Sequence, residues 1–146
     1  MLKAKEVELS YKRDRKLDRE KLQSSEDVFH FALKFYDDNV IDYKEYCYVI
    51  LMNNSLRPNG WHKVSEGGLT ETIVDIKIVL QAALLSNSAC IILVHNHPSG
   101  NVRPSKFDDK LTERLKNACE IMSIKFQDHV IVTSEAYYSY NDEGRL

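Results

Sequence analysis

A chain of 146 residues fits a single domain, and that length is enough to bury a hydrophobic core without disulfide bonds. The formal net charge of −2 gives no overall positive field, so the composition does not support nucleic acid as a partner. Because the longest apolar run, Ala89–Val94, is far too short to cross a membrane and the N-terminus has no apolar export region, we expect a soluble cytoplasmic protein with no membrane partner.

Residues 1–23 are predicted to form an extended arm and linker, which precede a domain of residues 24–146. Within the arm, Val7, Leu9 and Tyr11 alternate with polar residues, a pattern typical of a short, half-buried strand. The charged stretch after this strand would then link it to the domain.

The domain is predicted to begin with a helix capped by Ser24 or Ser25 and ending near residues 37–39. From Glu45 the chain is continuously apolar and rich in aromatic and β-branched residues, which indicates a central strand buried on both faces. Residues 53–60, which contain Pro58 and the pair Asn59-Gly60, then favour a turn into a second, antiparallel strand around residues 61–65.

The second half of the chain alternates helices with strands. Asp75 can cap an amphipathic helix, residues 90–94 form a buried apolar strand, and a long helix is expected over residues 106–122. Strands are expected over residues 124–132 and 137–140. The residues expected to face the core from the long helix are Phe107, Leu111, Leu115, Ala118 and Met122. This order predicts an α/β sandwich with a mixed central sheet and helices on its faces.

The three cysteines, Cys47, Cys90 and Cys119, are far apart in sequence and lie in apolar segments. An odd number without any Cys-x-x-Cys spacing suits neither a disulfide framework nor a cysteine metal site. We therefore expect three buried, free thiols.

Two histidines separated by one residue directly follow the predicted strand 90–94. In extended backbone, residues i and i+2 point to the same side, so His95 and His97 can present their imidazoles together. A sharp turn and a helix that begins near Ser105 would return Asp108 toward them. Three such ligands are typical of a divalent-metal site that keeps one coordination position open for chemistry.

Each of these residues also has a purely structural interpretation. The two histidines could satisfy backbone groups within a turn. Ser105 and Asp108 have the spacing of a helix cap, and Ser105 can serve both as a cap and at a metal site. His129 is interpreted as a structural histidine within the sheet rather than as a metal ligand, and a contact with a ligand is an open alternative. The buried strand, the turn and the spacing of Asp108 together favour the metal site.

The pattern His95-x-His97, seven residues, Ser105, two residues, Asp108 resembles the full motif of the JAMM (JAB1/MPN) metalloprotease-like domains. The run His-Asn-His-Pro-Ser-Gly is similar to the RadC branch in particular. Further segments that agree with this branch are Gly67–Thr70, Ala82–Leu84, Asp128–Val132 and Tyr137–Ser139. The resemblance covers residues 43–144.

The resemblance implies a cytidine-deaminase-like α/β/α sandwich, the JAB/MPN fold, with a zinc ion (Zn²⁺) held by His95, His97 and Asp108. It also implies a zinc-dependent hydrolase of the JAMM type, in which metal-activated water attacks a peptide or isopeptide carbonyl of a protein or peptide substrate. A glutamate at the start of an upstream strand, where Glu45 stands, would take the proton of the water, and Ser105 would stabilise the oxyanion.

Glu45 has a competing interpretation as half of a surface ion pair, and Glu66 is a second upstream carboxylate. Glu45 is favoured because a buried strand can fix its rotamer, as a catalytic base requires.

A different class of function is a non-catalytic or DNA-repair-associated RadC-like interaction module. Residues 1–40 show no sign of the helix-hairpin-helix region of fuller RadC proteins, and the near-neutral charge argues against nucleic acid. The complete ligand set favours the hydrolase.

A nucleobase deaminase is set aside because it would need a Cys-x-x-Cys pair. An exposed edge strand would allow a homo-oligomer, whose formation the sequence leaves open.

Overall fold

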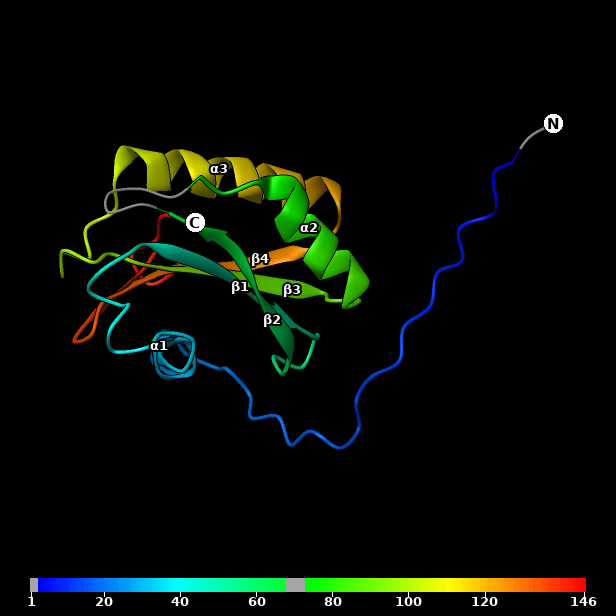
Figure 1. Cartoon of the computed structure of the whole chain (residues 1–146), viewed down its shortest axis with the longest axis horizontal. Coiled ribbons are helices and arrows are strands. Elements are labelled where there is room, and N and C mark those ends of the chain that lie inside the picture. The colour runs from blue at the N-terminus through cyan, green and yellow to red at the C-terminus, as the bar shows by residue number, and fades with distance from the viewer. Residues whose placement is uncertain (1–2, 68–72) are drawn as a thin grey trace.

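The computed structural model describes residues 3–67 and 73–146, in which helices cover both faces of a single sheet (Figure 1). The helices are α1 (Ser25–Leu33), α2 (Ile76–Leu85) and α3 (Lys106–Ile121). The strands are β1 (Tyr46–Met52), β2 (Pro58–Glu66), β3 (Cys90–Asn96), β4 (Lys125–Val132) and β5 (Tyr137–Ser139). The predicted α/β sandwich with a mixed sheet is confirmed.

The strand order in the sheet is β2-β1-β3-β4-β5. Only β3 and β4 pair in parallel, and the other neighbours are antiparallel. The helices α2 and α3 lie together on one face of the sheet, and α1 lies on the opposite face (Figure 1). β1 and β3 are therefore covered on both sides, as their continuous apolar sequences predicted.

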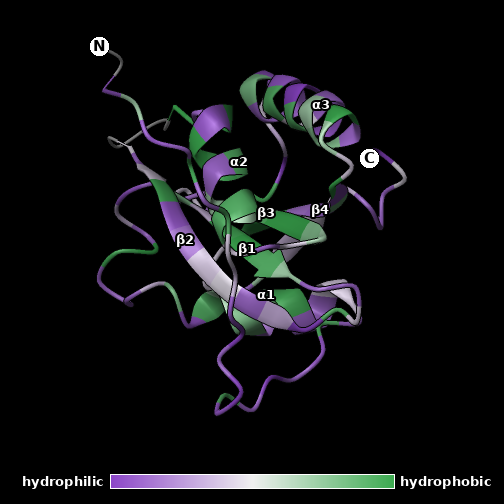
Figure 2. Cartoon of the chain, turned by 90° about the vertical axis from the view of Figure 1, so that its right-hand side faces the viewer, coloured by the Kyte–Doolittle hydropathy of each residue, from purple (hydrophilic) through white to green (hydrophobic). Residues whose placement is uncertain are grey.

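Alternation along β3 divides its side chains between two hydrophobic layers. Ile91 and Leu93 pack with α2 and α3, whereas Ile92 and Val94 pack with α1. Figure 2 shows the resulting apolar colour on both β1 and β3, in contrast to the more polar β2 at the sheet edge. Because side chains alternate with a period of two, His95 continues the row of Ile91 and Leu93 and lies on the face covered by α2 and α3.

The predicted strand in the arm is wrong. Val7 and Leu9 are exposed and residues 3–13 contain no strand, because no neighbouring strand supplies the hydrogen bonds that a strand requires. The arm extends away from the sheet in Figure 1 and joins the core at Leu22, which is buried and whose N–H donates to the carbonyl of Leu56. Within the part of the chain that the structure describes, no helix is long and apolar enough to cross a bilayer.

The turn between β1 and β2 lies within the predicted segment 53–60, but at its start, so β2 begins at Pro58 rather than near Trp61. Asn53 makes the turn, because its side-chain oxygen accepts hydrogen bonds from the N–H groups of Ser55 and Arg57. The Asn59-Gly60 pair is already part of β2. The hydrogen bonds that the Asn53 side chain accepts, rather than the Asn-Gly pair, thus determine where the chain turns.

The predicted caps of α1 and α2 are confirmed, although α1 is shorter than predicted. Ser24 caps α1 through a capping box with Asp27, and Asp75 caps α2. The helix α1 ends at Leu33 rather than near residues 37–39. Beyond it, Asp37 accepts a hydrogen bond from the N–H of Asn39, a local bond that competes with helix.

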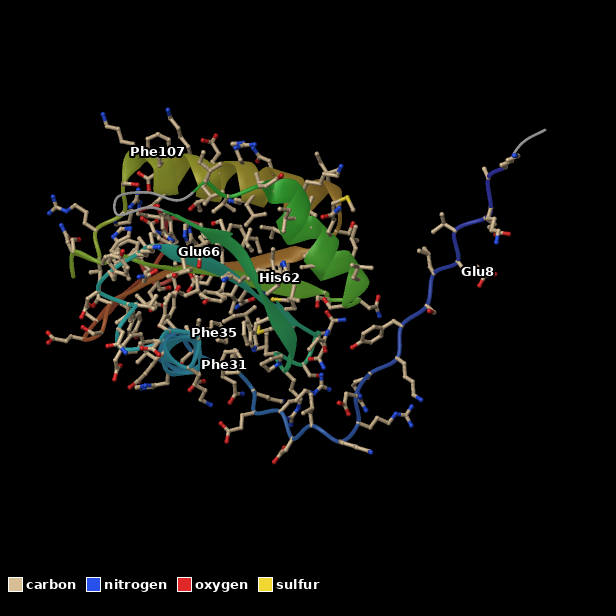
Figure 3. All side chains as sticks on the ribbon, viewed as in Figure 1. Glu8, Phe31, Phe35, His62, Glu66 and Phe107 are labelled. Atoms are coloured by element: carbon tan, nitrogen blue, oxygen red, sulfur yellow. The ribbon has the colours of Figure 1, made fainter. Side chains whose placement is uncertain are left out.

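The helix α3 has the predicted position but a different buried face. Leu115 is buried as expected, whereas Phe107 is 68% exposed and lies on the side of α3 away from the sheet (Figure 3). The buried residues of α3 are Asp108, Thr112, Leu115 and Cys119. Leu111 is partly buried and packs against the core as predicted, and the polar residues Asp108 and Thr112 share the inward face with it.

The three cysteines are free and buried, as predicted. Burial raises the pKa of the Cys90 and Cys119 thiols to about 11 and that of Cys47 well above its ordinary value. These thiols are therefore protonated members of the core. The Gly67–Thr70 segment lies largely outside the described residues.

Asn96, at the end of β3, fastens the segment that leads into β1. Its side-chain oxygen accepts a hydrogen bond from the N–H of Tyr46 at 2.8 Å. Its side-chain nitrogen donates to the carbonyls of Ile41 and Lys44 at 2.8 and 2.7 Å. Since Asn96 is fully buried, the three bonds fix the backbone on both sides of Glu45.

Replacing Asn96 with alanine should therefore destabilise the fold strongly. The change leaves one buried N–H and two carbonyls without their partner, and we expect the free energy of unfolding in urea to fall by about 2–4 kcal/mol. The exposed Asn54→Ala variant is the control and should change this free energy by less than about 0.5 kcal/mol. Equal stability of the two variants would show that these three hydrogen bonds, the Asn96 clamp, do not stabilise the fold.

Candidate metal centre

The sheet brings three separate segments of the chain to one edge of its α2/α3 face. β1 runs antiparallel to β3 and Cys47 pairs with His95, so Glu45 lies beside the end of β3. His97 follows β3 directly, and the first turn of α3 carries Asp108. The resulting cluster contains Glu45, His95, His97 and Asp108, with one ligand atom of each within 4.8 Å of the others.

Three of these side chains contact one another closely. Nε2 of His95 lies 3.0 Å from Nε2 of His97. Each of these nitrogens lies 3.1 Å from a different oxygen of the Asp108 carboxylate. Oε1 of Glu45 lies 3.8 Å from Nε2 of His95, so the Glu45 carboxylate is beside the group of three and slightly farther out.

Burial and charge act against one another in the cluster. Burial alone would raise the pKa of Asp108, but hydrogen bonds with His95 and His97 hold it far below its usual range, so this carboxyl group is ionised. Burial lowers the pKa of His95 by more than Asp108 raises it. Burial also acts downward on His97, but its hydrogen bonds to Asp108 and to the carbonyl of Asn101 raise its pKa overall.

The outward-facing nitrogens of both imidazoles are also held. Nδ1 of His97 lies 2.7 Å from the carbonyl oxygen of Asn101. Because a carbonyl only accepts, Nδ1 carries a proton, and Nε2 is the nitrogen that faces the cluster. Nδ1 of His95 lies 2.8 Å from Nε2 of His129, a fully buried side chain whose pKa burial lowers well below its ordinary value. His129 lies outside the cluster and is hydrogen-bonded to a member of it.

Asp108 and Ser105 also form the predicted cap of α3. Oγ of Ser105 accepts a hydrogen bond from the N–H of Asp108 at 3.1 Å, and Oδ2 of Asp108 accepts one from the N–H of Ser105 at 2.8 Å. This reciprocal pair is a capping box, and it fixes the same carboxylate oxygen that contacts His97. Ser105 is thus next to the cluster without belonging to it.

The donor set fits a divalent metal ion. Two imidazole nitrogens and a carboxylate are common ligands of zinc and other divalent ions. Ligands at about 2.0–2.1 Å from a tetrahedral zinc lie about 3.3 Å from one another. The separations of 3.0 and 3.1 Å among His95, His97 and Asp108 are close to that value. A buried cluster of this kind could hold a metal ion.

Of the two candidate glutamates, the structure brings only Glu45 to the cluster. Glu45 is buried, whereas the Glu66 side chain is 52% exposed and pairs with Lys63 at 3.5 Å. The Tyr46 hydroxyl and the Lys63 ammonium lower the pKa of Glu66. Glu66 is therefore part of a surface ion pair at the end of β2 and does not belong to the cluster.

Sequence reasoning did not identify three residues that hold the cluster in place. Asn96 fixes the segment around Glu45, as described above. The Thr112 hydroxyl lies 2.6 Å from Nδ1 of His129, and the Tyr140 ring stacks on the His129 ring at an interplanar angle of 4°. A buried asparagine between two histidines is a signal that could have been noticed, whereas Thr112 and Tyr140 carry no local signal.

A cleft of about 390 Å³ opens beside the cluster. Glu45, His95 and Asp108 line it, Val74 and Leu111 add apolar surface, and Lys110 and Arg114 add two cationic side chains. A larger cavity of about 520 Å³, between the arm, α1 and β2, is lined by none of the cluster residues. The cluster is thus accessible from a cleft of its own.

Comparison with known proteins gives a consistent family assignment. Residues 22–145 match the family described as the RadC-like JAB domain. The mixed sheet with helices on both faces is consistent with the JAB/MPN fold.

Several bacterial relatives, each described as a UPF0758 protein, are similar to this chain. The protein of Flavobacterium johnsoniae is 37% identical over 88% of this chain and 55% of its own length. The protein of Thermotoga maritima is 37% identical over 96% of this chain and 62% of its own length. The chain thus spans between half and two thirds of these two relatives. By its matched residues and these identities, the chain belongs to the RadC-like JAB domain family.

Proposed function

We propose that this protein is a zinc-dependent hydrolase that cleaves a peptide or isopeptide bond. The observation that carries the proposal is the largely buried convergence of two imidazole nitrogens and one ionised carboxylate beside a second carboxylate. The cleft next to these groups supports a role in chemistry rather than in scaffolding.

His95, His97 and Asp108 would hold the metal, since their ligand atoms are closest together. A zinc ion bound there would act as a Lewis acid that polarises a carbonyl and lowers the pKa of water to about 7. Zinc is proposed because nitrogen-rich sets of three protein ligands are typical of catalytic zinc sites.

Glu45 would act as the general base. Its carboxylate is buried at the start of a central strand, and its Oε1 lies 3.8 Å from Nε2 of His95 rather than within the group of three. From this position it can accept a proton from water in the cleft and return it to the leaving amine. The Asn96 clamp would keep the backbone on each side of Glu45 in place, as proton transfer requires.

Ser105 would donate to the negative charge that develops on the substrate carbonyl oxygen. Its Oγ accepts the capping bond from Asp108, so the hydroxyl hydrogen is not consumed by the cap. A fixed hydroxyl beside the proposed metal ligands can serve as an oxyanion donor.

The cleft supports a peptide-like substrate. The apolar surface of Val74 and Leu111 suits a side chain next to the bond that is cleaved. Lys110 and Arg114 would complement a carboxylate on the same substrate.

Asp108→Ala should abolish stoichiometric zinc binding, measured by elemental analysis after dialysis, because one of three ligands is lost. Asp27→Ala is the matched control, since Asp27 makes the same capping box at α1 without contacting the cluster. It should retain zinc. Equal zinc contents in the two variants would contradict the ligand assignment.

Glu45→Gln should retain zinc and lose hydrolysis by about 10²–10⁴-fold, because the amide cannot accept a proton. The measurement is cleavage of a peptide and isopeptide substrate library beside elemental analysis. Glu66→Gln should keep the activity of the unmodified protein. Loss of zinc in Glu45→Gln would instead make Glu45 a fourth ligand, and unchanged cleavage would remove it as the base.

Ser105→Ala should affect both stability and catalysis, whereas Ser24→Ala should affect stability alone. Each change removes the serine of a capping box and should lower the free energy of unfolding by about 0.5–2 kcal/mol. Only Ser105→Ala should lower kcat, by about 10²–10³-fold, if its hydroxyl is an oxyanion donor. Equal kcat values would leave Ser105 as a cap only.

A further inference from the structure

A chain of buried hydrogen bonds joins the rear of one proposed metal ligand to the backbone of another. Nδ1 of His95 lies 2.8 Å from Nε2 of His129, and Nδ1 of His129 lies 2.6 Å from Oγ1 of Thr112. The Thr112 hydroxyl donates to the main-chain carbonyl of Asp108 at 2.7 Å. His95, His129 and Thr112 are all buried, so water does not supply alternative partners.

The carbonyl at the end of this chain determines the direction of every bond in it. A carbonyl only accepts, so the one hydrogen of the Thr112 hydroxyl points to Asp108. The Thr112 oxygen can then only accept, and Nδ1 of His129 must carry a proton. A buried imidazole whose partners are a hydroxyl and another imidazole stays neutral, so Nε2 of His129 accepts. Nδ1 of His95 must therefore be the donor of the last bond.

We propose that Thr112 and His129 are positioning residues that hold the proton of His95 on Nδ1 and so keep the lone pair of Nε2 directed at the metal position. The inference rests on the proposed metal site. Metal-binding histidines generally donate their other N–H to a fixed acceptor, which sets the tautomer and the ring orientation. Here that acceptor is an imidazole whose own tautomer is set by a threonine.

His97 reaches the same state by a shorter route, because its Nδ1 donates directly to the carbonyl of Asn101. The two proposed ligands therefore depend on different acceptors. A change at Thr112 should alter the tautomer of His95 and leave the proton of His97 on Nδ1, which supplies an internal control within one protein.

The position of His129 is fixed from two sides. On the sheet side, β4 pairs in parallel with β3, and His129 is in register with Leu93. On the other side the Tyr140 ring stacks on the His129 ring with centroids 4.9 Å apart, and the Tyr140 hydroxyl donates to Asp109 at 2.7 Å. The stack fixes the plane of the His129 ring, and the hydrogen bonds with Thr112 and His95 lie at its two nitrogens.

The Asp108 carboxylate favours the opposite tautomer of His95, in which the proton is on Nε2. Its Oδ1 lies 3.1 Å from Nε2 of His95 and would accept a proton from that nitrogen. If Thr112 no longer accepted from His129, the His129 proton could move to Nε2 and donate to His95. Nε2 of His95 would then carry a proton toward Asp108, at the position that the metal requires.

Thr112→Val tests this proposal, because it removes the hydroxyl and keeps the shape of the side chain, while Thr112→Ser restores the hydroxyl. The measurements are two-bond ¹H–¹⁵N correlations of the histidine rings, without metal and with zinc, and zinc affinity by competition with a chelator. We expect Nδ1 protonation of His129 and His95 in the unmodified protein and in Thr112→Ser. In metal-free Thr112→Val we expect His129 to be protonated on Nε2 and zinc affinity to fall about 10–100-fold, with His97 unchanged.

A threonine that merely satisfies a helix carbonyl would give a different result. Thr112→Val would then change the melting temperature but not the histidine tautomers, and that outcome would overturn the proposal. Nε2 protonation of His129 in the metal-free unmodified protein would overturn it without any variant. Failure of the unmodified protein to bind zinc would refute the proposed metal site, while the metal-free spectra would still decide the direction of the hydrogen-bond chain.

Discussion

Two imidazole nitrogens and a carboxylate, held 3.0–3.1 Å apart and largely excluded from water, form an arrangement that needs positive charge between its members. The outward Nδ1 nitrogens of His95 and His97 carry protons. The inward Nε2 nitrogens and the ionised Asp108 carboxylate would therefore repel one another if no positive charge lay between them. Protons can supply the missing positive charge, but a divalent ion does so for all three groups at once. This electrostatic requirement explains why so much of the surrounding structure serves to hold polar atoms in place.

The fold meets that requirement at the cost of ordinary core packing. α3 presents Asp108 and Thr112 to the sheet, where apolar residues would pack more simply, and exposes Phe107. Buried polar groups are tolerated because each is bonded: among the described residues, no buried side-chain nitrogen or oxygen lacks a hydrogen-bond partner. The cluster is therefore held on rigid strands and a capped helix, the kind of support that a precise site needs.

Sequence reasoning succeeded where the signal was local. The apolar runs of β1 and β3, the caps at Ser24, Asp75 and Ser105, and the His-x-His spacing each depend on residues close together in the chain. These features were sufficient to predict the sandwich and to select His95, His97 and Asp108, whereas Glu45 was selected through the resemblance to the JAMM domains.

The remainder depends on tertiary contacts that a single sequence does not encode locally. The buried face of α3 was predicted only in part, because Asp108 and Thr112 bond inward to histidines, which the apolar pattern does not reveal. The Thr112–His129–His95 chain spans a helix and two parallel strands, so no spacing could reveal it. The arm offered an alternating pattern, but a strand also needs a partner.

The most direct test of the account is anomalous diffraction at the zinc absorption edge, from crystals of the unmodified protein grown with zinc. The account predicts a strong peak about 2.0–2.2 Å from Nε2 of His95, Nε2 of His97 and one oxygen of Asp108, with Glu45 beyond bonding distance. A cluster without such a peak, or zinc bound through Nδ1 of either histidine, would contradict it.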